Sequence, residues 1–220
     1  MDFKQCNSTN YKSGRSDDIK YLVIHYTGNN GDTARGNVSY FANNKNLSAS
    51  AHYFVDESGV WQSVKDVDTA WHCGAKIYKH SYCRNSNSIG IELCSRKDSS
   101  GNYYFKDETI RNAAELTKSL MVKYNIPVAN VIRHYDVTGK VCPAPMVNDT
   151  SLWDKFKGII SVPAKTLETA NDIIWELMNG KYKVEITEVD RAIKALGKAK
   201  NSTDYMSLYW ILYKIVNGND

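Results

Sequence analysis

The sequence predicts an α/β protein with a central mixed β-sheet flanked by helices, followed by a small all-α domain at its C-terminus. Between residues 20 and 160, short β-branched and aromatic runs alternate with segments of helical periodicity, which is typical of an α/β layer. Near Pro163 the pattern changes, and almost every later segment is helical. A chain of 220 residues can hold one core of roughly 150 residues and an appendage. We therefore predict two domains, residues 1–162 and 163–220.

The predicted strands are short apolar runs bounded by turn residues. Residues 20–27 (KYLVIHYT) end at a Gly-Asn turn, and His25 lies near the end of this run. The segments SAHYFVD (50–56) and VWQSV (60–64) are separated by Glu-Ser-Gly, which favours a hairpin. Residues 88–94 (SIGIELC) form another apolar run of strand length.

The clearest predicted helix covers residues 107–125. It begins with acidic residues, its apolar residues recur three or four apart, and Pro127 ends it. Residues 35–45 have the spacing of a helix that packs on a sheet, and a short helix is expected at 152–160. The segment HYDVTGKVCPAP, residues 134–145, is predicted to be a loop.

Three further helices are predicted at 168–180, 186–199 and 202–217. The last of them carries more aromatic surface than three short helices easily bury, so part of it should face a ligand or a second copy of the chain, as in a homodimer. Packing on the first domain is the alternative. The candidate contact residues are Trp175, Tyr209, Trp210 and Tyr213.

The composition is that of a soluble globular protein. With 42% hydrophobic and 24% charged residues, the chain has no apolar run near the ~20 residues that a membrane span needs. The net charge of +4 is modest and predicts no nucleic-acid partner. The first residues lack the apolar stretch of a secretory signal, so we expect synthesis in the cytoplasm and separate release. Five cysteines are an odd number and do not indicate a disulfide scaffold.

A histidine and a thiol lie close together in the predicted loop, as His134-x7-Cys142. Both side chains can reach one tetrahedral zinc ion, although a lone pair of this kind is more often structural. His25, at the end of a central strand, would add a third ligand. Three protein ligands leave the fourth zinc position open to water, which is the pattern of a catalytic site.

The segments VIHYT, SAHYFVD, AWHCG, NSIGIEL and RHYDVTGKVCP occur in an order and spacing that resemble the zinc-dependent N-acetylmuramoyl-L-alanine amidases. This family includes phage endolysins, bacterial amidases and peptidoglycan-recognition proteins, and the resemblance covers roughly residues 18–160. It implies a zinc ion held by His25, His134 and Cys142. It also implies a cationic group beside the developing oxyanion, Lys140, and a proton shuttle, Glu92.

The resemblance implies hydrolysis of the amide between N-acetylmuramic acid and L-alanine in peptidoglycan. It favours a phage endolysin of a Gram-positive host that is released from the host cytoplasm by a holin-type pore. For the C-terminal domain it suggests attachment to the cell wall. A non-catalytic peptidoglycan-binding protein, a cytosolic wall-recycling amidase and a structural-zinc protein remain alternatives.

Several site residues have a second interpretation. Glu92 could be a buried carboxylate paired with Arg or Lys, and Lys140 an ordinary loop lysine. His52, Trp71 and His72 are expected to line the substrate groove or to supply hydrogen bonds, although a tryptophan is a core residue at least as often.

Ala51 stands where some relatives have a tyrosine, which shifts the proton-transfer role further toward Glu92. Tyr26 and Tyr53 are weaker candidates for that role. Three of the four thiols outside the predicted metal site, Cys73, Cys83 and Cys94, are interpreted as small buried hydrophobes or as an incidental disulfide.

Overall fold

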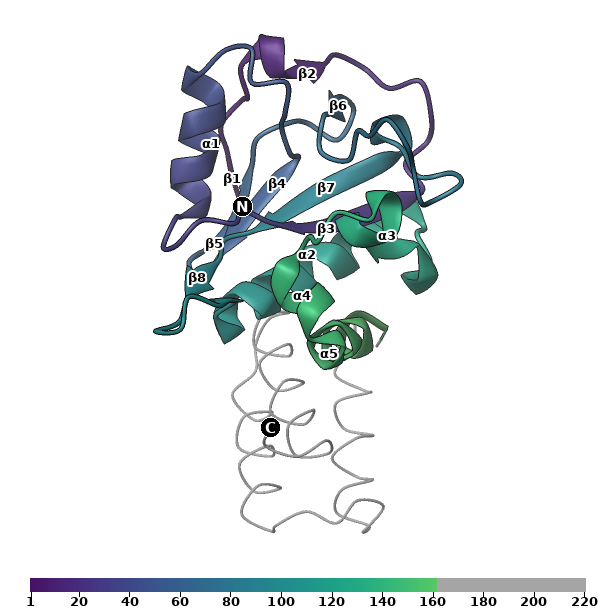
Figure 1. Ribbon diagram of the computed structural model, residues 1–220. Helices are drawn as coiled ribbons and strands as arrows, with labels where there is room; N and C mark the ends of the chain where they lie inside the picture. Colours follow the sequence, from purple (N-terminus) through teal and green to yellow (C-terminus); the bar gives the residue numbers. More distant parts are fainter. Residues whose placement is uncertain (162–220) are drawn as a thin grey trace, which may run out of the picture. The chain divides into compact units, whose positions relative to one another are not determined.

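The computed structural model describes residues 1–161 (Figure 1). The three helices predicted beyond residue 162, and the four aromatic residues singled out there, lie outside the described residues and stay a prediction. In the described part of the chain, none of the helices has the length and apolar character that a membrane span requires.

A six-stranded mixed sheet forms the centre of the described unit, with the order β1-β5-β4-β7-β3-β10. The neighbours β4, β7, β3 and β10 run parallel to one another, whereas β4 and β5 form the antiparallel hairpin predicted from the sequence. The prediction of a mixed sheet is thus confirmed. The strands are β1 Asp2–Phe3, β3 Tyr21–Tyr26, β4 Tyr53–Asp56, β5 Gly59–Gln62, β7 Ser88–Leu93 and β10 Val131–Arg133.

Two small antiparallel pairs and three single turns of 3₁₀ helix connect these strands. The pairs are β2 (Tyr11–Lys12) with β6 (Thr69–Ala70), and β8 (Arg96–Lys97) with β9 (Tyr103–Tyr104). The 3₁₀ turns are η1 Ser8–Asn10, η2 Asn85–Asn87 and η3 Val128–Asn130.

Helices cover both faces of the sheet (Figure 1). Helix α1 (Ala34–Asn43) packs on β4 and β5, with Phe54 and Cys94 in its apolar contact. Helix α2 (Asp107–Tyr124) contacts β4, β5 and β7 and also α5 (Thr150–Ser161). The helices expected at 107–125 and 152–160 are therefore present with nearly the predicted bounds.

The segment 134–145, predicted to be a loop, is partly helical, and this prediction was wrong. It contains α3 (His134–Thr138) and the start of α4 (Ala144–Asn148). The Asp136 carboxylate accepts the backbone N–H of Arg133 at 2.9 Å and caps the first of them. A proline precedes the second. Helices of five residues are too short for apolar periodicity to show in the sequence.

The strand β7 divides its side chains between the two faces of the sheet. Glu92 of β7 is the register partner of Phe54 on β4, and Phe54 packs against α1. Glu92 therefore lies on the face that α1 covers, together with Gly90 and Ser88, which are two and four positions earlier on the same strand. The buried residues between them, Ile89, Ile91 and Leu93, point to the opposite face. The strand therefore carries a polar row and an apolar row.

Candidate metal centre

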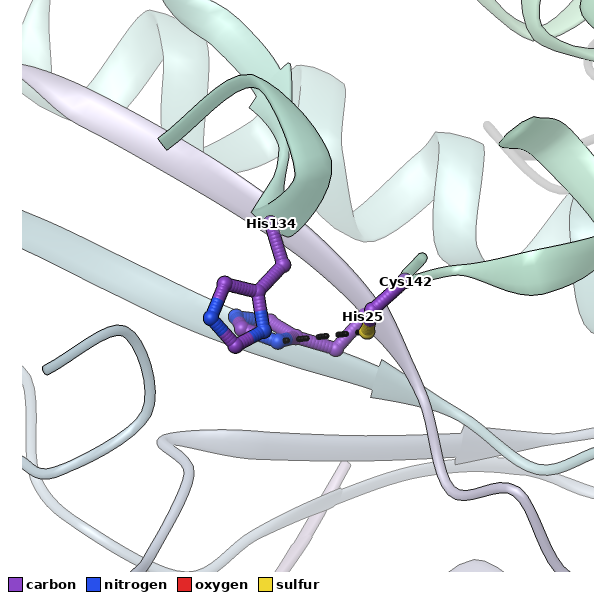
Figure 2. A group of neighbouring side chains, drawn as sticks. All are labelled: His25, His134 and Cys142. Atoms are coloured by element: carbon purple, nitrogen blue, oxygen red, sulfur yellow. Dashed lines mark hydrogen bonds between the residues drawn. The ribbon is translucent and has the colours of Figure 1, made fainter. Parts of the chain in front are cut away.

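Three side chains from distant parts of the sequence meet at one edge of the sheet (Figure 2). His25 lies near the C-terminal end of β3, and His134 follows directly after β10, the parallel neighbour of β3. Because parallel neighbours end at the same edge, these two histidines lie side by side. Cys142, in the segment between α3 and α4, completes the group, whose ligand atoms all lie within 4.8 Å of one another.

The separations fit one tetrahedral ion. The Cys142 Sγ lies 3.8 Å from His25 Nδ1, and the rings of His25 and His134 have centroids 4.6 Å apart. Zinc–nitrogen and zinc–sulfur bonds of ordinary length place ligand atoms roughly 3.3 to 3.6 Å apart. All three residues are buried, with at most 7% of their surface exposed. Two imidazoles and one thiolate are also the donor types that zinc prefers.

Two buried polar atoms at this place lack a hydrogen-bond partner among the described residues. They are His134 Nδ1 and Glu92 Oε2. Figure 2 shows the His134 ring turned so that one nitrogen faces His25 and Cys142. A buried polar atom without a partner costs about 1 to 3 kcal/mol. A cation bound between the three side chains would satisfy the His134 atom, so the residues present fit a zinc ion.

Burial sets the protonation state of the three ligands. It lowers the pKa of His25 well below its usual value, and neighbouring His134, His72 and Lys140 lower it further. Burial, with the charge of Lys140, lowers the pKa of His134 to about 4. Burial raises the pKa of the Cys142 thiol to about 12. Near neutral pH both imidazoles are therefore neutral and ready to bind a metal, whereas the thiol must lose its proton to do so.

Glu92 stands beside this cluster, as the register partner of His25 on the adjacent strand. Its Oε1 lies 3.9 Å from His25 Nδ1, and about 20% of its side chain is exposed. Burial raises its pKa to about 8, although the charge of Lys140 lowers it and that of Asp32 raises it. The side-chain contact that the structure gives Glu92 is with His25, which is neutral near neutral pH, and not with an arginine or a lysine.

Lys140 is exposed on the turn that leads to Cys142. Its charge lowers the pKa of His25, His134, Glu92 and Cys142, so it acts on every titratable group of the cluster. An exposed cation therefore lies close enough to the cluster to act on it.

His52, Trp71 and His72, the three residues expected near a substrate groove, differ from one another in burial and contacts. His52 is fully buried, and its Nδ1 accepts the backbone N–H of Gly90 at 3.0 Å while its Nε2 contacts Arg15 at 2.6 Å. In this arrangement it offers a substrate no free nitrogen. Trp71 and His72 are half-buried. His72 contacts His25, with 3.1 Å between His72 Nδ1 and His25 Nε2.

Two residues of this site were missed by the sequence reasoning, Ser88 and Gly90. Ser88 is fully buried and bonds to His72, and the His72 ring lies directly against Gly90. The signal was available: in SIGIEL, Ser, Gly and Glu alternate with Ile, Ile and Leu, and a period of two assigns them to one face.

A buried His, His and Cys set with a carboxylate beside it has the ligand pattern of a catalytic zinc site. Comparison with known proteins gives the family. Residues 15–145 match the N-acetylmuramoyl-L-alanine amidase family, and the chain belongs to it.

Relatives of known name support this membership. The chain is 35% identical over 149 residues to N-acetylmuramoyl-L-alanine amidase CwlL of Bacillus licheniformis, a match that covers 63% of this chain and 40% of the relative. It is 32% identical over 152 residues to the amidase CwlH of Bacillus subtilis, with 68% and 56% covered. The chain thus spans less than two thirds of the length of these relatives.

Solved structures share the fold. The catalytic domain of XlyA has a TM-score of 0.59 and 29% identity, with 73% of this chain and 99% of that chain covered. PlyL has a TM-score of 0.60 and 27% identity, with 74% and 97% covered. The resemblance inferred from the sequence motifs is confirmed.

Proposed function

We propose that this protein hydrolyses the amide bond between N-acetylmuramic acid and L-alanine in peptidoglycan, using a zinc ion held by His25, His134 and Cys142. The observation that carries the proposal is the convergence of these three buried side chains next to Glu92 in a chain of the amidase family. The family match covers residues 15–145 and so contains the cluster, and relatives whose names state this activity support the proposal.

The residues around the cluster are suited to the steps of amide hydrolysis. His25, His134 and Cys142 would hold the zinc ion, which when bound would lower the pKa of a water molecule to about 7 and polarise a carbonyl group. Glu92 would accept a proton from the attacking water and deliver it to the amide nitrogen as the carbon–nitrogen bond breaks, a role that its position 3.9 Å from His25 Nδ1 supports. A divalent cation bound next to Glu92 would ionise it, and the carboxylate could then take up the proton. Lys140 would stabilise negative charge on the substrate carbonyl oxygen.

The alternatives are less well supported by the site. A protein that only binds peptidoglycan would not need a complete ligand set and a carboxylate of raised pKa, and both are present here. A structural zinc ion normally has four protein ligands, whereas the described cluster supplies three.

We further propose an endolysin role in the lysis of a Gram-positive host. A structure titled as a mutant endolysin from Bacillus subtilis supports this, with 30% identity and a TM-score of 0.58. In this role the protein is made in the host cytoplasm and reaches the wall after release. Residues 163–220 would attach it to the wall through Trp175, Tyr209, Trp210 and Tyr213, or join two copies.

Digestion of purified peptidoglycan with and without a zinc chelator tests the activity. New L-alanine amino termini and new reducing sugar ends are counted by mass spectrometry. We expect stem peptides to be released from intact glycan chains, and a chelator to stop the release. Binding to peptidoglycan with no release of stem peptides would support the recognition protein instead.

A further inference from the structure

His72 connects the candidate ligand His25 to the interior through hydrogen bonds. Its Nδ1 lies 3.1 Å from His25 Nε2, and its Nε2 lies 3.1 Å from the Ser88 hydroxyl. The Ser88 Oγ in turn lies 2.6 Å from the carbonyl oxygen of Arg84. Three consecutive contacts therefore run from a backbone carbonyl to the proposed metal ligand.

The direction of each hydrogen bond follows from the first one. A carbonyl oxygen can only accept, so the single hydroxyl proton of Ser88 is donated to Arg84. The Ser88 oxygen must then accept from His72, which places a proton on His72 Nε2. In a neutral imidazole the other nitrogen carries a lone pair, so His72 Nδ1 accepts the proton of His25 Nε2.

The local structure holds the first contact of this hydrogen-bond series, between Ser88 and the Arg84 carbonyl, in place. Arg84 directly precedes η2, and its backbone N–H donates to the Asn87 side chain at 2.8 Å. This turn brings the Arg84 carbonyl onto Ser88, the first residue of β7 and fully buried. The acceptor that sets the direction of all three hydrogen bonds is therefore a backbone carbonyl, which cannot become a donor.

Gly90 supplies the space that the His72 ring needs. A Cβ atom at this position would lie 2.5 Å from His72 Cγ and 2.8 Å from His72 Nδ1, which is closer than such atoms can approach. The ring consequently lies against the bare backbone of β7, between Ser88 and His25. Any larger residue would displace the ring from both hydrogen-bond partners.

We propose that His72 and Ser88 are positioning residues that fix the proton of His25 on Nε2 and thereby leave His25 Nδ1 free to bind the metal. His25 Nδ1 is the nitrogen that faces Cys142, with 3.8 Å between it and Sγ. Hydrogen bonds of this kind to the far side of a metal-binding imidazole fix its tautomer and orientation. The function of His72 is then to orient a ligand, not to bind substrate. The inference rests on the proposed zinc site.

The tautomer of His25 can be measured in the metal-free protein, without any activity assay. Long-range ¹H–¹⁵N correlation spectra distinguish a protonated from an unprotonated ring nitrogen. In the full-length wild type we expect the proton of His25 on Nε2. In Ser88→Ala, which removes the acceptor of His72, a share of His25 should carry the proton on Nδ1. A wild-type His25 protonated on Nδ1 would overturn the proposal.

Zinc affinity, measured by competition with a chromogenic chelator, provides the second readout. His72→Phe removes the acceptor and should weaken zinc binding by about 10- to 100-fold. His72→Asn places an amide oxygen near the position of Nδ1 and should recover most of that loss. Ser88→Ala should weaken binding on the order of tenfold. Ser63→Ala, at another fully buried serine outside this chain of contacts, is the matched control and should bind zinc as the wild type does.

The two proposals fail in different ways. If the wild type does not bind zinc, the proposed metal site is wrong, while the tautomer measurement still decides the role of His72. If the wild type binds zinc and both His72→Phe and Ser88→Ala bind it equally well, the positioning role is wrong. Thermal melts show which variants are folded, and Ser88→Ala removes only a hydroxyl group should His72→Phe fail to fold.

Discussion

Zinc binding should release two protons from this protein near pH 6, and the replacement Glu92→Gln should reduce that number to one. Burial gives the Cys142 thiol a pKa of about 12, so at pH 6 it holds its proton until a metal displaces it. Burial gives Glu92 a pKa of about 8, so at pH 6 about 99% of this carboxyl group is protonated. A divalent cation next to Glu92 should ionise it.

The two histidines contribute almost nothing to this count. The pKa of His134 is about 4 and that of His25 is lowered well below its usual value, so at pH 6 both are neutral before zinc binds. Because protons compete with zinc for the site, the affinity rises with pH. Two released protons correspond to about a 100-fold rise per pH unit between about pH 5 and 7, and one released proton to about tenfold.

Calorimetric titrations with zinc at pH 6, in buffers of different ionisation enthalpy, give the number of protons directly. The control is Glu57→Gln. Burial raises the pKa of Glu57, but hydrogen bonds from Lys106 and Arg96 lower it more, to about 2, so this carboxylate is already ionised. The control should release two protons, as the wild type does. If the wild type and Glu92→Gln both release one proton, Glu92 does not hold a proton in the metal-free site, and the reasoning from its burial is wrong.

Four further predictions concern activity and stability. Cys142→Ser should lose tightly bound zinc together with hydrolysis, and metal analysis that finds one zinc per chain in this variant would contradict the ligand assignment. Lys140→Met should keep zinc but lower kcat by about 10²- to 10³-fold if it stabilises the oxyanion, as removal of such a group does elsewhere; an unchanged kcat would make it an ordinary loop lysine. Gly90→Ala should destabilise the fold by about 1 to 3 kcal/mol, because the new Cβ overlaps the His72 ring, and a melting temperature equal to that of the wild type would show that the ring can move at no cost. Removal of residues 163–220 should leave the cleavage of short soluble muropeptides largely intact and weaken sedimentation with whole cell walls, and unchanged sedimentation would refute the targeting role.

The sequence by itself determined the types and order of the main elements. Apolar, β-branched runs bounded by turn residues and a period near 3.6 in residues 107–125 are local properties, so they can be read without the fold. The family motifs also identified the three candidate ligands and Glu92. The short helices α3 and α4 were not predicted, because neither is long enough to show periodicity. The first is favoured instead by a local cap, in which the Asp136 carboxylate accepts the N–H of Arg133.

The tertiary structure decided which atoms face one another. His25 and Cys142 are 117 positions apart. The parallel pairing of β3 with β10 brings the start of α3 beside His25, and the hydrogen bond from the Tyr135 N–H to the Cys142 carbonyl holds Cys142 there, 3.8 Å from His25 Nδ1. Burial then lowers the pKa of the histidines and raises those of the thiol and of Glu92, because desolvation disfavours every charged form.

The fold also separated histidines that look alike in the sequence. His52 and His72 were both expected to supply hydrogen bonds or to line a substrate groove. His52 is enclosed with both nitrogens in contact, whereas His72 lies over Gly90 and contacts His25. Residue types and strand periodicity give the face on which a side chain lies. Which of the two ring nitrogens of a histidine carries the proton depends on a hydrogen-bond partner from another part of the chain. The sequence pattern around the histidine does not show that partner.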